Sequence, residues 1–170
     1  REAGAETLAL VAITGGGSAL LSAPADGVPL ADLQTLTEEL LQSGAPIDRI
    51  NSVRKHISVL KGGQLARALA PATTVGLVFS DVPSGDPSVV ASGPLSPDPT
   101  TYADAVATLS EYGVAAPASV SRHLQRGVEG GVPETAGADD HAFEHTSIHV
   151  VADNFTALAA ARDVCREAGF

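Results

Sequence analysis

The sequence is short of several residue types, and each shortage excludes a class of protein. Cys165 is the single cysteine, so an internal disulfide cannot form, and we expect a buried structural thiol in a cytoplasmic protein. No apolar run approaches the roughly 18 residues that a membrane-spanning helix needs. The start of the chain lacks the charged and apolar regions of a secretory signal. Methionine is absent, which favours an internal piece of a longer polypeptide.

Positive charge is scarce as well. The chain has 10 basic residues against 20 acidic ones, for a net charge of −10, and its lysines are Lys55 and Lys61. An acidic surface repels nucleic acid and anionic membranes, so we expect neither as a partner. Few lysines with an excess of acids are typical of a salt-adapted, halophilic organism. Any cluster of basic residues in this chain is therefore conspicuous.

The remaining composition fits one globular α/β domain. The 170 residues, 44% of them hydrophobic, suffice for a single core over residues 1–170. Three strand-like runs, which begin at Thr7, Thr74 and Ser147, alternate with helix-like segments and lack hairpin signals. This order predicts a doubly wound, mostly parallel sheet with helices on both faces. The expected helices are 29–43, 48–60, 64–69, 101–112, 117–126 and 155–168, and residues 127–144 are expected to form a surface loop.

The first strand ends in a glycine-rich turn. Gly15, Gly16 and Gly17 allow a sharp turn and a close approach of the backbone to a ligand. Ser18 then opens a helix-forming segment whose N-terminus favours an anion. The turn lacks the GxxxxGK pattern of a nucleotide P-loop and the GxGxxG spacing of a dinucleotide fold. It is therefore either an anion cradle or only a tight strand-to-helix turn.

The predicted helix at 48–60 and the residues after it concentrate positive charge. Polar side chains recur there at spacings of three and four on one face: Asn51, Arg54, Lys55, Ser58 and Lys61. A solvated basic face and a site for a phosphate or carboxylate both stay open. The concentration of cations against the overall charge favours the site. His56, between the two faces, is typical of a structural histidine.

Acidic residues follow the second strand. Asp81 comes directly after it and Asp86 lies five residues on, in a long connection rich in Ser, Asp, Pro and Gly. Because the carboxyl ends of parallel strands border ligand crevices, these carboxylates either hold Mg²⁺ or only stabilise turns. A metal cluster of His141 and His145 with the neighbouring aspartates is disfavoured, because it lacks cysteine partners and a firm helical placement.

Several blocks of the sequence together resemble the glycerate 2-kinase family, whose members also carry the name hydroxypyruvate reductase. The blocks are GGGSALL at 15–21, INSVRKHISVLKGGQLA at 50–66, SDV at 80–82 and VVASGPLSPDPTTYADA at 89–105. The stretch 149–170 is similar to the family's next strand and helix. The resemblance implies a Rossmann-like α/β domain that pairs with a second α/β domain. We expect that second, C-terminal domain and the family's N-terminal part to lie outside residues 1–170.

The resemblance also implies an activity, the phosphorylation of D-glycerate by ATP with Mg²⁺ as cofactor, usually at the 2-hydroxyl to give 2-phosphoglycerate. By position, it implies catalytic roles for Arg54, Lys55 and Lys61. It also implies that Asp81 and Asp86 face the metal ion. The substrate- or phosphate-binding positions that it implies are Gly15, Gly16, Gly17, Ser18, Asn51, Ser58, Ser92 and Gly93.

The sequence departs from the family pattern in two places. Ser84-Gly85-Asp86 stands for the usual Gly-Asp-Asp, so one acid is absent, and Leu95 replaces a usual threonine. Two other functions stay open. One is an NAD(P)H-dependent hydroxypyruvate reductase, which the missing GxGxxG disfavours. The other is a non-catalytic domain that binds a sugar phosphate or a nucleotide. The sequence also leaves open whether the protein forms a homo-oligomer.

Overall fold

The structure, a computed structural model, describes residues 3–82 and 85–170. Its centre is a sheet of three parallel strands in the order β1-β2-β3, namely β1 (Leu8–Thr14), β2 (Thr73–Phe79) and β3 (Thr146–Ala152). Each strand coincides with an apolar run of the sequence. The predicted α/β class with a parallel sheet is therefore confirmed.

Helices connect and follow the strands. Within the described residues they are α1 (Gly17–Leu20), α2 (Leu30–Gln42), α3 (Ile47–His56), α4 (Gln64–Leu69), α5 (Tyr102–Glu111), α6 (Ala118–Val128) and α7 (Asn154–Glu167), with the 3₁₀ turns η1 (Val90–Ser92) and η2 (His141–Phe143). Every helix that the sequence predicts is present. For example, α5 begins with a capping box, because Thr101 and Asp104 each accept a hydrogen bond from the other's backbone N–H.

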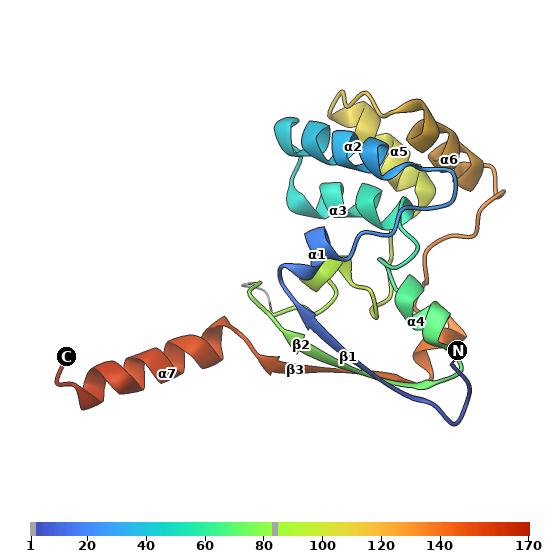
Figure 1. The fold of residues 1–170 in the computed structure, drawn as a ribbon. Helices are drawn as coiled ribbons and strands as arrows, with labels where there is room; N and C mark the ends of the chain where they lie inside the picture. The colour runs from blue at the N-terminus through green and yellow to red at the C-terminus, as the bar shows by residue number, and fades with distance from the viewer. Residues whose placement is uncertain (1–2, 83–84) are drawn as a thin grey trace.

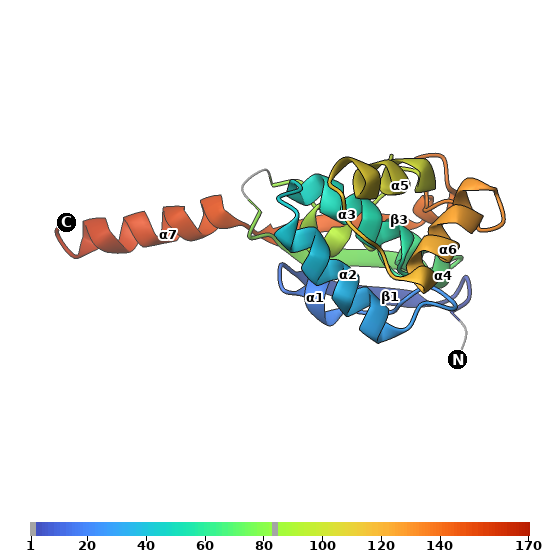
Figure 2. The ribbon, with the colours of Figure 1, turned by 90° about the horizontal axis from the view of Figure 1, so that it is seen from above.

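Helices α1 to α6 lie over one face of the sheet, as two perpendicular views show (Figures 1 and 2). Because the strand order is the chain order, right-handed crossovers bring both connections to the same face. One hydrophobic cluster, which includes Leu36 and Val53, joins α2, α3, α5 and α6. A second cluster, which includes Val78 and Leu95, fills the space between the sheet and the segments that cross it. The site described below lies where these two layers meet.

Two helices are shorter than the sequence predicts. α1 is a single turn, so the expected N-terminal dipole, which depends on a run of aligned peptides, gives little support to an anion there. α3 ends at His56 instead of Leu60. The reason is that residues 57–59 pair with the connector at 23–25, where the Ala25 N–H donates to the Ile57 carbonyl and the Val59 N–H to the Ala23 carbonyl.

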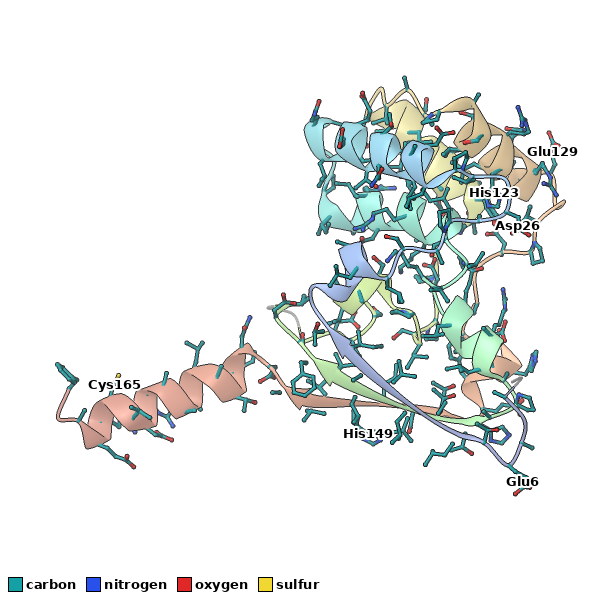
Figure 3. All side chains as sticks on the ribbon, viewed as in Figure 1. Glu6, Asp26, His123, Glu129, His149 and Cys165 are labelled. Atoms are coloured by element: carbon teal, nitrogen blue, oxygen red, sulfur yellow. The ribbon has the colours of Figure 1, made fainter. Side chains whose placement is uncertain are left out.

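The C-terminal helix has a different environment from the others. α7 extends away from the body of the molecule (Figures 1 and 3), and none of its residues is buried. Cys165 lies on this helix and is exposed. The prediction of a buried thiol is therefore wrong, because no other described element covers α7. The outer side chains of β1, such as Leu8 and Leu10, are exposed as well.

One further expectation needs correction. The segment at 127–144 is not only a surface loop, because Thr135 and Ala136 are buried and the Ala136 backbone bonds to Gly62 and Asp98. On α2, Leu36 and Leu40 are buried, whereas Leu30 and Leu41 are exposed. None of the helices in the described ranges combines the length and apolar content needed to cross a membrane.

Candidate functional site

The site forms where the glycine turn after β1 meets the end of α3 and the turn that follows it. The Ser18 carbonyl accepts hydrogen bonds from Arg54 Nη2 at 2.8 Å and from Lys61 Nζ at 2.9 Å. Lys61 Nζ also donates to the Leu21 carbonyl at 3.2 Å. The chain leaves the helix after His56, and this change of direction brings Lys61 beside Arg54. Two cations therefore converge on one backbone oxygen.

The described part of the protein places little negative charge near these two cations. Lys61 is only 4% exposed, and its burial, together with the charge of Arg54, lowers its pKa to about 8. Burial also lowers the pKa of Arg54. Within the described residues, no carboxylate lies at ion-pair distance from either side chain. An anion bound here would relieve both effects, so the pair is complementary to a phosphate or a carboxylate.

A chain of side-chain hydrogen bonds ties the glycine turn to α3. Ser18 Oγ lies 2.9 Å from Ser92 Oγ, and the Ser92 hydroxyl donates to Asn51 Oδ1 at 3.1 Å. Ser92 has a left-handed backbone with φ 63°, as have its neighbours Ala91 and Gly93. The Ser92 and Gly93 carbonyls accept hydrogen bonds from the Gly62 and Gly63 N–H groups. Ser18, Asn51 and Ser92, which come from three separate blocks of the sequence, are thus brought together.

Lys55 points to a different part of the molecule. Its Nζ lies 3.2 Å from Asp98 Oδ1, and the Asp98 carboxylate is fully buried. Asp98 also accepts hydrogen bonds from the Thr100 and Thr135 hydroxyls. Asp98 and Thr135 were not predicted as important. Asp98 lies inside the block at 89–105, one of the blocks identified from the sequence. Nothing in the sequence shows that Asp98 pairs with Lys55.

His56 belongs to the same buried network. Its Nδ1 lies 2.7 Å from the Ser52 carbonyl, and its ring meets Tyr102 edge to face with centroids 4.8 Å apart. Burial and the nearby charge of Glu134 raise the pKa of Tyr102 to about 12, so its phenol stays protonated near neutral pH. These contacts fit the structural role that the sequence suggests for His56.

The two aspartates of the predicted metal site have different surroundings. The Asp81 carboxylate covers Gly15 so closely that a Cβ added to Gly15 would overlap it. Asp86 Oδ1 accepts a hydrogen bond from the Ser88 N–H at 2.8 Å, which is turn chemistry. Ser84, two residues before Asp86 in the sequence, lies outside the described residues. The described residues hold no group of three or more potential metal ligands of the His, Cys, Asp or Glu types, and Asp140 pairs with Arg67.

Two cavities border the Arg54 side chain. The smaller one, of about 180 Å³, is lined by Gly15, Ser18, Asn51, Arg54 and Asp81 together with apolar residues. The larger one, of about 390 Å³, lies between α1, α2 and the end of α3, and its wall includes Ser58 and Lys61. Ser18 and Arg54 line both cavities and so separate them. Seven of the thirteen predicted site residues therefore line these two adjoining cavities. The predicted residues that line neither cavity are Gly16, Gly17, Lys55, Asp86, Ser92 and Gly93.

The fold and the charge of the site define a parallel α/β protein with a cationic cavity beside the carboxyl ends of its strands. The chain belongs to the family described as Domain of unknown function (DUF4147), which matches residues 1–125. The resemblance to glycerate 2-kinases is confirmed too. A "Glycerate 2-kinase" of Pyrococcus horikoshii is 45% identical over 78% of this chain, and a "D-glycerate 2-kinase" of Thermotoga maritima is 38% identical over 95%.

Other similarities agree with this assignment. A "Putative hydroxypyruvate reductase" of Agrobacterium vitis is 45% identical over 98% of the chain. A crystal structure of a glycerate kinase from Thermotoga maritima matches 96% of the chain with a TM-score of 0.80 at 39% identity, and one of a Pyrococcus horikoshii protein matches 100% with 0.84, also at 39%. The chain spans 30% to 36% of these curated relatives and 37% to 38% of the solved chains.

Proposed function

We propose that this chain provides the anion-binding part of a kinase that phosphorylates D-glycerate with ATP. The observation that carries the proposal is the Arg54–Lys61 pair, which has no carboxylate at ion-pair distance among the described residues and borders two cavities. Phosphoryl transfer depends mainly on positioning the reactants and neutralising their charge. Relatives named as glycerate kinases support glycerate as the acceptor.

Each residue has a role in this proposal. Arg54, with its planar fork of donors, binds the glycerate carboxylate or the transferring phosphate, and Lys61 neutralises the phosphate. The Gly15–Ser18 backbone forms one wall of the cavity, because glycine allows a close approach. Asn51 and Ser92 position Ser18, and the Ser58 hydroxyl accepts from the Lys61 N–H and so stabilises the turn that carries Lys61. Lys55, bonded to Asp98, holds α3 in place.

We assign the metal site to Asp81. Its carboxylate lines the smaller cavity beside Gly15, and a hard oxygen ligand of this kind fits Mg²⁺, which is commonly held by one or two carboxylates and substrate phosphates. Mg²⁺ would neutralise charge on the phosphate oxygens. Asp86, which the resemblance pairs with Asp81, is engaged with Ser88 in the structure. Asp86 therefore contributes in our proposal only through a rearrangement of its loop.

The proposal includes 2-phosphoglycerate as the product and a cleft that is completed by parts of the protein outside residues 1–170. The test uses the full-length protein with ATP, Mg²⁺ and D-glycerate. We expect ADP to form, and phosphorus NMR should show one phosphate ester, on the 2-hydroxyl. An ester on the 3-hydroxyl would show that the product is 3-phosphoglycerate, and the proposed kinase activity would still stand.

A second candidate is reduction of hydroxypyruvate, because one relative carries that name. The glycine turn argues against it, since TGGGS does not have the spacing of a dinucleotide-binding fingerprint. The same preparation, incubated with NADH and hydroxypyruvate, separates the two reactions. Oxidation of NADH without any ADP formation in the kinase assay would overturn our proposal.

A further inference from the structure

The larger cavity combines two cations with apolar walls. Its walls include Leu20, Leu30 and Leu33, and Arg54 and Lys61 line the same cavity. Leu20 is 87% exposed and Leu30 is 50% exposed, so both leave apolar surface uncovered beside a charged site. A cavity of about 390 Å³ is within the usual range for small-molecule sites, which are mostly apolar with a few polar anchors.

The two cations of the larger cavity match a doubly charged group. Arg54 and Lys61 together supply two positive charges without an ion-pair partner among the described residues. Lys61 Nζ donates to two carbonyls, and an ammonium group has three protons, so one proton is available to a ligand. A phosphate monoester carries about 1.5 to 2 negative charges at pH 7. Glu38 also lines the cavity, and its charge keeps the phosphate away from its own side.

The apolar walls are complementary to a ligand that has an apolar part as well as a charged group. D-glycerate is polar throughout, and it would leave Leu20, Leu30 and Leu33 in contact with water. We propose that this cavity binds an organic phosphate whose apolar, planar body lies against these leucines while its phosphate meets Arg54 and Lys61. This site uses the same cations as the proposed kinase site, but binding in it does not require glycerate phosphorylation. Nucleotides and simple aryl phosphates share this chemistry.

The experiment is calorimetric titration of the full-length protein at pH 7 without glycerate or magnesium, using phenyl phosphate, ADP and inorganic phosphate in separate runs. We expect phenyl phosphate to bind at least tenfold more tightly than inorganic phosphate. Tighter binding of ADP than of phenyl phosphate identifies a nucleotide as the natural ligand, and weaker binding identifies a phosphate without a nucleoside. Because no turnover is measured, a failure of this site and a failure of the kinase reaction are separate results.

Two variants of exposed leucines test the apolar contact. We expect Leu20→Gln/Leu30→Gln to weaken phenyl phosphate binding about tenfold and to leave inorganic phosphate binding unchanged. Leu41→Gln is the matched control, because Leu41 is an exposed leucine of the same helix, α2, and lines neither cavity. Equal affinities for phenyl phosphate and inorganic phosphate would overturn the proposal. So would an equal loss in both variants, or a lower melting temperature of the double variant without a change in binding, which would show that protein covers the leucines.

Discussion

Two cation sites, only a few residues apart in the sequence, have opposite electrostatic surroundings. Lys55 pairs with the buried carboxylate of Asp98, whereas Lys61 lies beside Arg54 without a carboxylate partner among the described residues. The first arrangement is neutral and complete within the protein. The second has excess positive charge. In our proposal, Lys55 therefore stabilises the structure, and Arg54 and Lys61 bind a ligand.

Removal of Asp98 should have the largest effect, a loss of stability, because Lys55 then lacks the carboxylate that distinguishes its surroundings from those of Lys61. Asp98→Ala leaves the Lys55 ammonium without its partner in a largely buried position, and we expect the free energy of unfolding to fall by about 3–5 kcal/mol. Chemical denaturation of the full-length protein measures the change. Asp98→Ala/Lys55→Met removes both charges and should recover a large part of the loss. Equal stability of the single and double variants would show that the pair does not contribute as we infer.

Removal of Arg54 should have the next largest effect, on turnover instead of stability. Arg54→Gln should lower kcat/KM for glycerate about 100-fold, as expected for the loss of a donor that stabilises developing charge. Its melting temperature should not fall, because Lys61 loses an unfavourable neighbour. Arg49→Gln is the matched control, since Arg49 is an exposed arginine of the same helix. If both variants keep full activity, Arg54 is not part of the site.

A change of pH should have a smaller effect, on the stability of the protein and on phosphate binding at the Arg54–Lys61 site. The pKa of Lys61 is about 8 in the folded protein, below its ordinary 10.5, so the unfolded chain binds more protons between these values. The stability of the ligand-free protein should therefore rise from pH 8 to 10.5, while the affinity for inorganic phosphate falls about tenfold for each pH unit above 8. Calorimetry and denaturation measure the two trends. A Lys61→Met variant should lack this component of both.

The smallest effect on activity should come from a displacement of Asp81, whose carboxylate lies against Gly15. Gly15→Ala would displace the Asp81 carboxylate, and we expect a loss of about fivefold in kcat/KM, roughly 1 kcal/mol, with a higher requirement for magnesium. Gly16→Ala is the control, because a Cβ at Gly16 meets no atom within 4 Å. Identical magnesium dependence in the two variants would remove Asp81 from the metal site that we propose.

Local patterns predict most of the fold. The three apolar runs end at glycine, serine or aspartate, and the helices begin and end at recognisable residues such as Thr101 and Gly113. The end of α3 was not predictable in this way, because residues 57–59 pair with a connector more than thirty positions earlier. The exposure of Cys165 was missed for a related reason. An amphipathic pattern shows that a helix has an apolar side, but not whether another element covers it.

The candidate site was predicted as a set of residues but not as an arrangement. The blocks containing Ser18, Asn51, Arg54 and Ser92 were identified, and the structure joins them by hydrogen bonds. The separation of Lys55 from Lys61 was not visible, because helical spacing places them on one face. Only the early end of α3 and the position of Asp98, 43 residues further along the chain than Lys55, separate the two lysines.

The left-handed run at Ala91, Ser92 and Gly93 has a consequence for ligand binding. Ala91 and Ser92 have a Cβ, so each occupies a backbone region that favours glycine and that surrounding contacts must stabilise. Those contacts come from the Gly62 and Gly63 N–H groups and from Asn51, which are all part of the protein itself. The loop is therefore ordered during folding and not on ligand binding. A ligand that reaches Ser18 meets a preorganised wall, so its affinity is not reduced by the entropy of ordering this loop.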